Sequence, residues 1–207
     1  MRIIKQQEAP RSRAAATAAR RAQIIEAAID VLAERGYVGA SFEVIAARAA
    51  LSSKRLITYH FETKERLYAA VLAEVFDRAA RFMGPLIAEH TGYRAKFLAY
   101  IRSNVGFLAA SPREMRAVGE IIFNASAAVE GAREASDTAR ERLATAFREG
   151  QQSGEFRDFD ADVMATTVRS AIDAAGPRFA EGADPARYTD ELVVLFDRAT
   201  RKAESND

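Results

Sequence analysis

Hydrophobic residues recur at intervals of three and four along most of the chain, which is the spacing of an amphipathic α-helix. The first such segment covers residues 17–35, where Ile24, Ala28 and Leu32 share one face. No segment of useful length alternates between apolar and polar residues with the period of two that a half-buried strand requires. The pattern therefore predicts an all-α protein.

Residues that begin or end helices delimit the first three predicted helices. Gly36 follows the first helix, at a position where a glycine in the left-handed conformation ends a helix. Ser41 can cap a second, short helix by accepting a hydrogen bond from a backbone N–H. Ser52 or Ser53 can cap a third helix, which ends near Phe61, and the sequence leaves both serines as candidates.

The rest of the chain is predicted to form longer helices. A fourth helix begins after Thr63 and is expected to end before Gly84-Pro85, because proline cannot continue the helical hydrogen bonds. Further helices are expected over residues 93–110, 112–124, 136–153, 161–175 and 185–202. These segments make about nine helices, which we divide into a three-helix domain at residues 20–66 and a larger helical domain at residues 67–207.

Charge is distributed unevenly between these domains. The net charge is only +1, yet residues 1–66 carry 12 Lys and Arg against 7 Asp and Glu. Most of the excess precedes residue 22, so residues 1–19 are predicted to be a basic, flexible arm that attracts polyanions such as nucleic acids. The alternatives for this segment are a solubilising tail and a transit peptide.

Composition argues against several functional classes. The chain has no cysteine, which removes disulfides, thiolate zinc sites and cysteine nucleophiles, and His60 and His90 are too few and too far apart for a metal centre. It contains no nucleophile elbow, phosphate-binding loop or dinucleotide fingerprint, so we predict neither an enzyme nor a cofactor. No apolar run approaches the roughly 20 residues that cross a bilayer, and we expect a cytoplasmic, nucleoid-associated protein without membrane contact.

The second and third predicted helices and the turn between them have the outline of a helix-turn-helix. Ile57 and Phe61 are spaced four apart and would face inward. The outward positions carry side chains that can hydrogen-bond to base edges, namely Ser53, Lys54, Arg55, Thr58 and Tyr59. Phosphate contacts are predicted for Ser41, Tyr59, His60 and Lys64.

The stretch from Ile24 to Leu67 resembles the DNA-binding domain of the tetracycline-repressor (TetR) family. The resemblance is carried by Gly36-Tyr37, Ser41-Phe42-x-x-Ile45-Ala46 and, most specifically, Tyr59-His60-Phe61-x-x-Lys64. The chain departs from the family pattern at Ala50, where the turn usually carries glycine, and in one additional residue between Ile45 and Phe61. The second departure leaves it open which of Lys54, Arg55 and Leu56 reaches the bases.

The resemblance implies a homodimer that binds a palindromic double-stranded DNA operator and makes no contact with a membrane. A small, mostly apolar effector is expected to release it from the DNA. Candidate effector-binding residues are Phe97, Ile101, Asn104, Met115, Phe123, Phe147, Met164 and Val168, with Asn104, Arg102 or Arg169 as polar anchors. Candidate dimer-interface residues are Ile172, Leu192, Leu195, Phe196 and Ala199. Both apolar sets can instead be core, and the alternative function is a helical adapter that binds protein partners without DNA.

Overall fold

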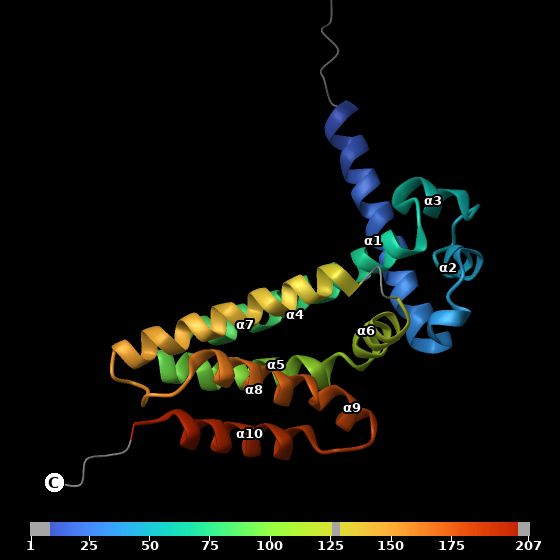
Figure 1. The fold of residues 1–207 in the computed structure, drawn as a ribbon. Coiled ribbons are helices and arrows are strands. Elements are labelled where there is room, and N and C mark those ends of the chain that lie inside the picture. Colours follow the sequence, from blue (N-terminus) through green and yellow to red (C-terminus); the bar gives the residue numbers. More distant parts are fainter. Residues whose placement is uncertain (1–8, 126–128, 203–207) are drawn as a thin grey trace, which may run out of the picture. The chain divides into compact units, whose positions relative to one another are not determined.

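The computed structural model describes residues 9–125 and 129–202, and within them the chain is helical apart from turns and one isolated β-bridge between Phe156 and Arg201 (Figure 1). The predicted all-α fold is confirmed. The helices are α1 (Ala9–Gly39), α2 (Phe42–Arg48), α3 (Arg55–Phe61), α4 (Lys64–Ala88), α5 (Tyr93–Ala110), α6 (Pro112–Asn124), α7 (Val129–Gln152), α8 (Ala161–Asp173), α9 (Ala175–Ala180) and α10 (Pro185–Thr200). No helix in the described ranges is both long and apolar enough to span a membrane.

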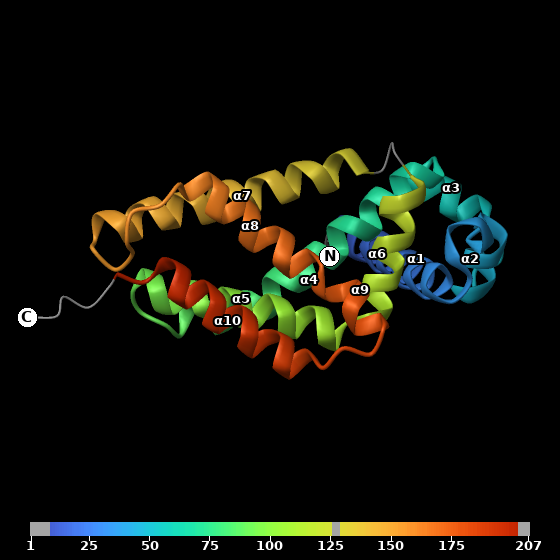
Figure 2. The same ribbon diagram turned by 60° about the horizontal axis from the view of Figure 1, so that its bottom comes forward.

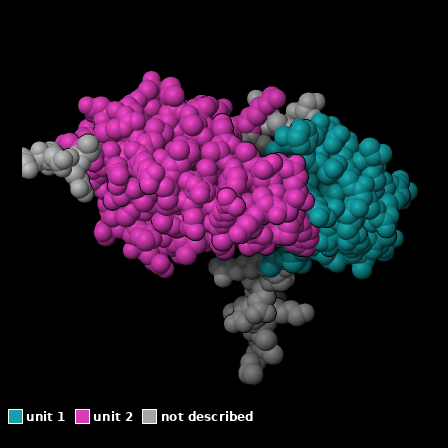
Figure 3. All heavy atoms as spheres, turned by 90° about the horizontal axis from the view of Figure 1, so that it is seen from below, with its two compact units in different colours: residues 1–72, 116–128 teal, residues 73–115, 129–207 magenta. Residues whose placement is uncertain are grey.

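The chain divides into two compact units, which Figure 3 shows in different colours. The first unit holds residues 1–72 and 116–128, and the second holds residues 73–115 and 129–207. The first unit extends beyond the predicted boundary at residue 66 because the start of α4 is part of its core. Tyr68 is fully buried there and its hydroxyl donates a hydrogen bond of 3.1 Å to the carbonyl oxygen of Ala40.

Helix α1 begins earlier than the sequence pattern predicts. Residues 9–19, which we assigned to a flexible arm, are helical, and the remaining arm residues 1–8 lie outside the described part of the chain. The segment is rich in alanine, the strongest helix former, and Pro10 lies in the first turn, where a missing N–H is tolerated. Residues 9–19 carry no large apolar residues at helical spacing. Hydrophobic periodicity therefore could not reveal this part of the helix.

Three other boundaries differ from those predicted. Helix α4 continues past Pro85 to Ala88, because a proline so close to the C-terminal end removes one hydrogen bond and disturbs only the last turn. Helix α7 already begins at Val129, ahead of the expected break at residues 130–131. The short α9 is an additional helix, and it contains Pro177 within its first turn.

An aromatic cluster forms the core of the second unit. Phe147 of α7 is fully buried, and its ring centroid lies 4.9 Å from that of Phe97, 5.6 Å from that of Phe156 and 5.3 Å from that of Phe159. Helix α7 packs along α8, and α5 packs along α10, as the ribbons in Figures 1 and 2 show. The apolar stripes of these helices therefore meet one another inside a single unit.

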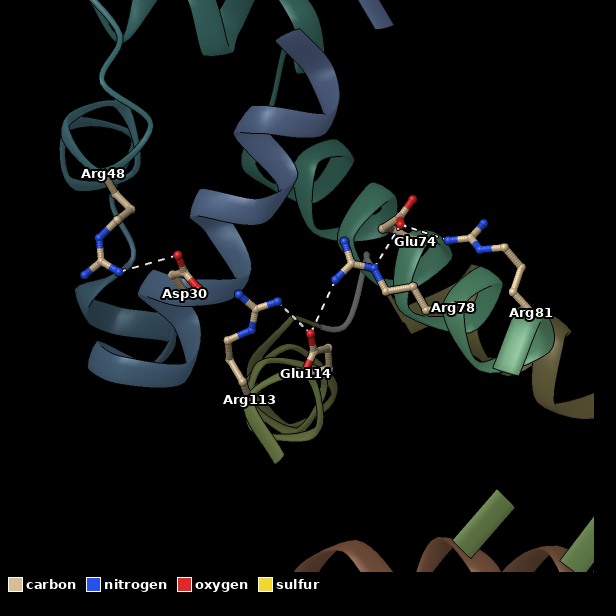
Figure 4. A network of polar contacts seen from close by, with 7 residues as sticks. All are labelled: Asp30, Arg48, Glu74, Arg78, Arg81, Arg113 and Glu114. Atoms are coloured by element: carbon tan, nitrogen blue, oxygen red, sulfur yellow. Dashed lines mark hydrogen bonds and ion pairs between the residues drawn. The ribbon is translucent and has the colours of Figure 1, made fainter. Parts of the chain in front are cut away.

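Within the second unit an ion-pair network joins α4 to the start of α6 (Figure 4). Arg78 donates from Nε to Glu74 over 2.9 Å and from Nη1 to Glu114 over 3.3 Å. Glu114 also accepts a hydrogen bond of 2.6 Å from Arg113. The network therefore joins the two helices by charge-assisted hydrogen bonds.

Candidate nucleic-acid interface

Helices α1, α2 and α3 share a small core in the first unit. Ile24 and Leu32 of α1, Ile45 of α2, and Ile57 of α3 are fully buried, and Phe61 is 3% exposed. The inward positions that the helical spacing predicts are therefore the buried ones. This core fixes the orientation of α3, whose other face is exposed.

A glycine breaks the path of α1 before the second helix. Gly36 has φ 68° and ψ 178°, outside the helical region, as its position after the apolar stripe predicts. The break frees the N–H of Tyr37, which donates a hydrogen bond of 2.7 Å to Oε2 of Glu120. A β-carbon at Gly36 would approach the same carboxylate oxygen to 3.1 Å, so both backbone conformation and space favour glycine.

The turn between α2 and α3 is a Schellman motif. Ser41 caps α2 at its start by accepting a hydrogen bond of 3.3 Å from the N–H of Val44. At its end the N–H of Leu51 donates to the carbonyl oxygen of Ala46 over 2.9 Å, and Ala50 adopts φ 49°. Ala50 thus occupies the left-handed position that glycine usually fills in this motif, and the first departure from the family pattern changes the residue but not the turn.

The left-handed conformation of Ala50 predicts that glycine stabilises this position. Ala50→Gly is expected to raise the free energy of unfolding by about 0.5–1 kcal/mol, because the strain of a left-handed alanine exceeds the additional chain entropy of glycine. Chemical denaturation followed by circular dichroism measures the change. The matched control Ala47→Gly, at an exposed helical position of α2, is expected to lower stability by about 0.5–1 kcal/mol. A loss of stability with Ala50→Gly would contradict the turn geometry.

Helix α3 begins at Arg55 with Lys54 at its N-cap and no side-chain cap, so the predicted serine cap is wrong; Ser53, and not Ser52, is the serine that bonds to the first turn. Its Oγ accepts a hydrogen bond of 3.2 Å from the N–H of Arg55, and its carbonyl oxygen accepts one of 3.1 Å from the N–H of Leu56. The burial of Ile57 and Phe61 sets which side chains of α3 face outward. The exposed residues are Ser53, Lys54, Arg55, Thr58 and Tyr59. Leu56 is half-buried, so Arg55 is the better placed of the two to reach a base edge.

Carboxylates of the first unit pair with two cations of the helix-turn-helix. Lys54 forms an ion pair with Glu43 in the first turn of α2, and the hydrogen bond from Lys54 lowers the pKa of Glu43. Arg48 at the end of α2 donates to Glu34 over 2.8 Å and lies 3.6 Å from Asp30 of α1 (Figure 4). Arg55 therefore carries a larger share of the positive charge on the exposed face than the sequence alone indicates.

Two residues of α1 hold the C-terminal ends of α2 and α3, and sequence reasoning missed both. Gln23 donates a hydrogen bond of 2.7 Å from Nε2 to the carbonyl oxygen of Ala49. Arg21 donates from Nη1 to the carbonyl oxygen of His60, and its guanidinium carbon lies 4.3 Å from the ring centroid of Phe61. A cation at a helix C-terminus satisfies a terminal carbonyl and opposes the helix dipole.

Two of the residues predicted to contact phosphate are engaged within the first unit. Lys64 is half-buried, donates a hydrogen bond of 3.2 Å to the carbonyl oxygen of Tyr37, and lies 4.3 Å from the ring centroid of Tyr37. Burial lowers the pKa of Lys64. Burial, followed by the charge of Arg21, lowers the pKa of His60, so its imidazole is neutral at pH 7 and can donate one N–H. The phosphate contacts of Lys64 and His60 stay predictions.

The structure does not gather the candidate effector residues around one pocket. Phe97, Ile101, Phe147 and Val168 belong to the close-packed core of the second unit. Asn104 is buried, whereas Met115 and Met164 are half-buried. Phe123 is 89% exposed on the part of α6 that belongs to the first unit, so it does not line a pocket inside the second. An open groove of about 460 Å³ in the second unit is lined instead by His90, Arg94, Ala95, Leu98, Arg102 and Glu155.

Most of the candidate interface residues are core of the second unit. Ile172, Leu192 and Phe196 are 1%, 9% and 3% exposed, because α10 packs its stripe of residues 192 and 196 inward. Ala199 is half-buried, and only Leu195 of this set is largely exposed, at 58%. Val163 on α8, which the sequence pattern also places with this apolar set, is 62% exposed, and sequence reasoning missed only Val194 on α10, an exposed apolar residue beside the buried stripe.

The first unit is small and contains a helix-turn-helix, and the second unit is larger and helical in its described residues. Residues 24–71 match the family model of the bacterial regulatory proteins of the tetR family. The HTH-type transcriptional regulator RutR of Escherichia coli strain K12 is 38% identical over 65 residues, which are 31% of this chain and 30% of RutR. Residues 24–71 are therefore similar to the tetR family, and the match with RutR spans less than a third of that relative's length.

Solved structures extend the similarity to both units. A structure from Pseudomonas aeruginosa PAO1, described as a transcriptional regulator, has a TM-score of 0.77 at 23% identity and covers 94% of this chain and 96% of that chain. AibR, in complex with isovaleryl coenzyme A and operator DNA, has a TM-score of 0.69 at 20% identity and covers 85% of this chain and 97% of AibR. At these identities the similarity establishes the fold. The family model and these relatives are described as regulators of transcription or as regulatory proteins.

Proposed function

We propose that the protein is a cytoplasmic, nucleoid-associated repressor that binds a palindromic operator as a homodimer and is released by a small-molecule effector. The observation that carries this proposal is the exposed face of α3, where Arg55, Thr58 and Tyr59 project from a helix whose opposite face is core. Arginine pairs with the acceptors of guanine, and threonine contacts a base edge or a thymine methyl group. The match of residues 24–71 to the tetR family model supports the same interpretation of this face.

The exposed stripe of α10 supports the proposed homodimer. Glu191, Val194, Leu195 and Arg198 are all exposed and follow one another at the spacing of a single helical face. If two copies of α10 cross antiparallel between Val194 and Leu195, each Glu191 faces Arg198 of the partner copy. The stripe is then self-complementary, as a two-fold symmetric interface requires. The proposal requires that this dimer present two α3 helices at the spacing of about 34–36 Å that successive major grooves demand.

The second unit supplies the proposed effector response. It is the larger of the two units, and AibR, which shares its fold, was solved with both a small molecule and operator DNA. An effector can weaken DNA binding only as far as it binds the released conformation more tightly than the DNA-binding conformation. The proposal therefore requires an effector site in the second unit whose occupancy changes the geometry of the dimer.

Selection of bound sequences from random duplex DNA tests the proposed function. We expect an enriched, partly palindromic sequence that binds the full-length protein with an affinity that falls steeply as salt concentration rises. Arg55→Ala is expected to change the preference between selected sequences, because a base-contacting residue determines specificity. Failure to enrich any sequence, together with little salt-dependent duplex binding, would refute the proposal and favour the helical adapter.

Neutralising the carboxylate of Glu43 is expected to strengthen DNA binding. Glu43→Gln removes a negative charge from the face that meets phosphate and releases the ammonium of Lys54, so duplex affinity should rise about three- to tenfold. The slope of log affinity against log salt should steepen by about 0.9, as for one more phosphate contact. Fluorescence anisotropy over a salt series measures both quantities.

Glu89→Gln is the matched control for Glu43→Gln. It makes the same change in net charge at an exposed position of the second unit. We expect it to leave the salt slope unchanged. An equal gain in affinity for both variants would assign the effect to total charge and contradict the proposed placement of Glu43 beside the DNA.

A further inference from the structure

A charged side chain lies between α5 and α8 in the second unit. Arg169 of α8 has a side chain that is only 20% exposed. Its Nη1 donates hydrogen bonds of 3.0 Å to the hydroxyl of Tyr100 and 3.2 Å to Oδ1 of Asn104, both on α5. Its Nη2 donates one of 2.7 Å to Oδ1 of Asp173, one turn further along α8. The guanidinium is thus fixed from three directions.

One donor of this guanidinium is left over. The Nε of Arg169 is buried, and it has no hydrogen-bond partner among the described residues. A buried N–H without an acceptor is unfavourable, and it is most unfavourable on a charged group. Nε and Nη2 project two parallel N–H groups from one edge of the guanidinium, which is the edge that binds a carboxylate through both oxygens. Only a single oxygen of Asp173 reaches this edge, at Nη2.

Asp173 is the replaceable partner of Arg169. Its side chain is 57% exposed, so it can turn into solvent and remain hydrated there. Asp173 lies four residues after Arg169 on the same helix and reaches the guanidinium with one oxygen, at Nη2. The neighbouring positions on the two helices are apolar, since Val168, Ile172 and Ile101 belong to the buried core.

We propose that Arg169 is the anion subsite of the effector site, and that it binds the carboxylate of a small, otherwise apolar organic acid. The carboxylate takes the place of Asp173 at Nη2 and reaches Nε with its second oxygen, while Tyr100 and Asn104 keep the guanidinium oriented. One negative charge replaces another at Arg169, so the exchange leaves the charge at the guanidinium balanced. The role of this acid as effector rests on the proposed function, whereas its binding does not.

The chemistry of the subsite selects the ligand class. A cationic ligand would face the guanidinium and is disfavoured. A neutral amide can present one acceptor but no charge, so it would leave Arg169 without a counter-ion if it displaced Asp173. The bidentate geometry and the apolar neighbours together favour a monocarboxylate with a hydrocarbon chain or ring.

Calorimetric titration with octanoate and benzoate, each compared with its own amide, tests the subsite. We expect the full-length protein to bind at least one of the two acids, and to bind it about tenfold or more tightly than its amide. Arg169→Met should remove this preference, and Arg169→Lys should retain only part of it because lysine lacks the planar fork. Because an apolar residue often replaces a buried ion pair without loss of stability, Arg169→Met is expected to fold, which circular dichroism checks.

The affinity of the Asp173→Asn variant for the acid distinguishes a binding role of Arg169 from a merely structural one. Removing the competing carboxylate is expected to tighten binding of the acid by about tenfold. Asp162→Asn makes the same change at an exposed position of α8 and should leave binding unchanged. The inference is overturned if neither acid binds, if acid and amide bind equally, if Arg169→Met binds as the unaltered chain does, or if Asp173→Asn weakens binding.

The experiment separates this inference from the proposed function. Binding of the selected duplex is measured on the same preparation, with and without the acid that binds. Duplex binding without any acid binding would refute the subsite alone. Acid binding that depends on Arg169, without any effect on the duplex, would support the subsite and refute its role in releasing DNA.

Discussion

Replacing Phe147 by alanine is expected to lower the free energy of unfolding by about 3–5 kcal/mol. The side chain is fully buried, and three aromatic rings lie within 5.6 Å of its centroid. Removing it deletes the transfer energy of a whole ring and leaves a cavity that neighbouring helices cannot fill without moving. Chemical denaturation monitored by circular dichroism measures the loss.

Phe123→Ala is the matched control, because it makes the same substitution at a residue that is 89% exposed. Its effect is expected to stay within about 0.5 kcal/mol of zero. Both phenylalanines were candidate effector residues on the same grounds, so the pair compares a core position with a surface position. A loss below about 1 kcal/mol for Phe147→Ala would mean that the ring lines a space that water or a ligand already occupies.

Local signals sufficed to predict the helix-turn-helix. Gly36 and Ser41 are placed by their own backbone requirements, which depend on a few neighbouring residues and can be read directly. Ala50, which is left-handed, shows that a local turn geometry can persist when its usual residue is replaced. The resemblance expects glycine there, and the turn keeps the geometry that glycine would have although the residue differs.

What an apolar helical face packs against could not be predicted from its periodicity. The pattern of α10 places Leu192 and Phe196 on one stripe and Leu195 on its flank, but it does not say whether core, ligand or a second copy covers each. Packing of α10 on α5 decides this and buries the first two residues. The predicted interface was therefore mostly core, and its exposed flank is the better candidate.

The roles of charged residues that bond inside the fold could not be predicted from the sequence either. Arg21 entered the sequence analysis only as part of the excess positive charge before residue 22, yet it stacks on Phe61 and caps the end of α3. Arg169 stood among several possible polar anchors until its contacts with Tyr100 and Asn104 distinguished it. In both cases the partner lies 39 residues or more away in sequence, so no local pattern connects the two.

Leu195→Arg is expected to abolish the proposed dimer and operator binding with it. Two-fold symmetry brings residue 195 of both copies to the same contact, so the substitution places two unpaired charges at its centre. We expect the dimer dissociation constant to rise about 100-fold or more. Sedimentation equilibrium measures that constant, and anisotropy with the selected palindrome should show a comparable loss. Leu86→Arg, at a 40% exposed leucine of α4, is the matched control and should leave the dimer intact.

Charge reversal tests the antiparallel register as well as the location of the interface. Arg198→Glu places Glu191 of one copy opposite a second carboxylate of the other, twice per dimer, and should weaken association strongly. Adding Glu191→Arg to the same chain restores opposite charges at both contacts and is expected to recover most of the dimer affinity. A surface elsewhere would lose nothing to the first change, and a parallel crossing of α10 would not be rescued by the second. Because rescue requires the two residues to meet across the symmetry axis, it would identify the interface by its geometry and not merely by its sensitivity to mutation.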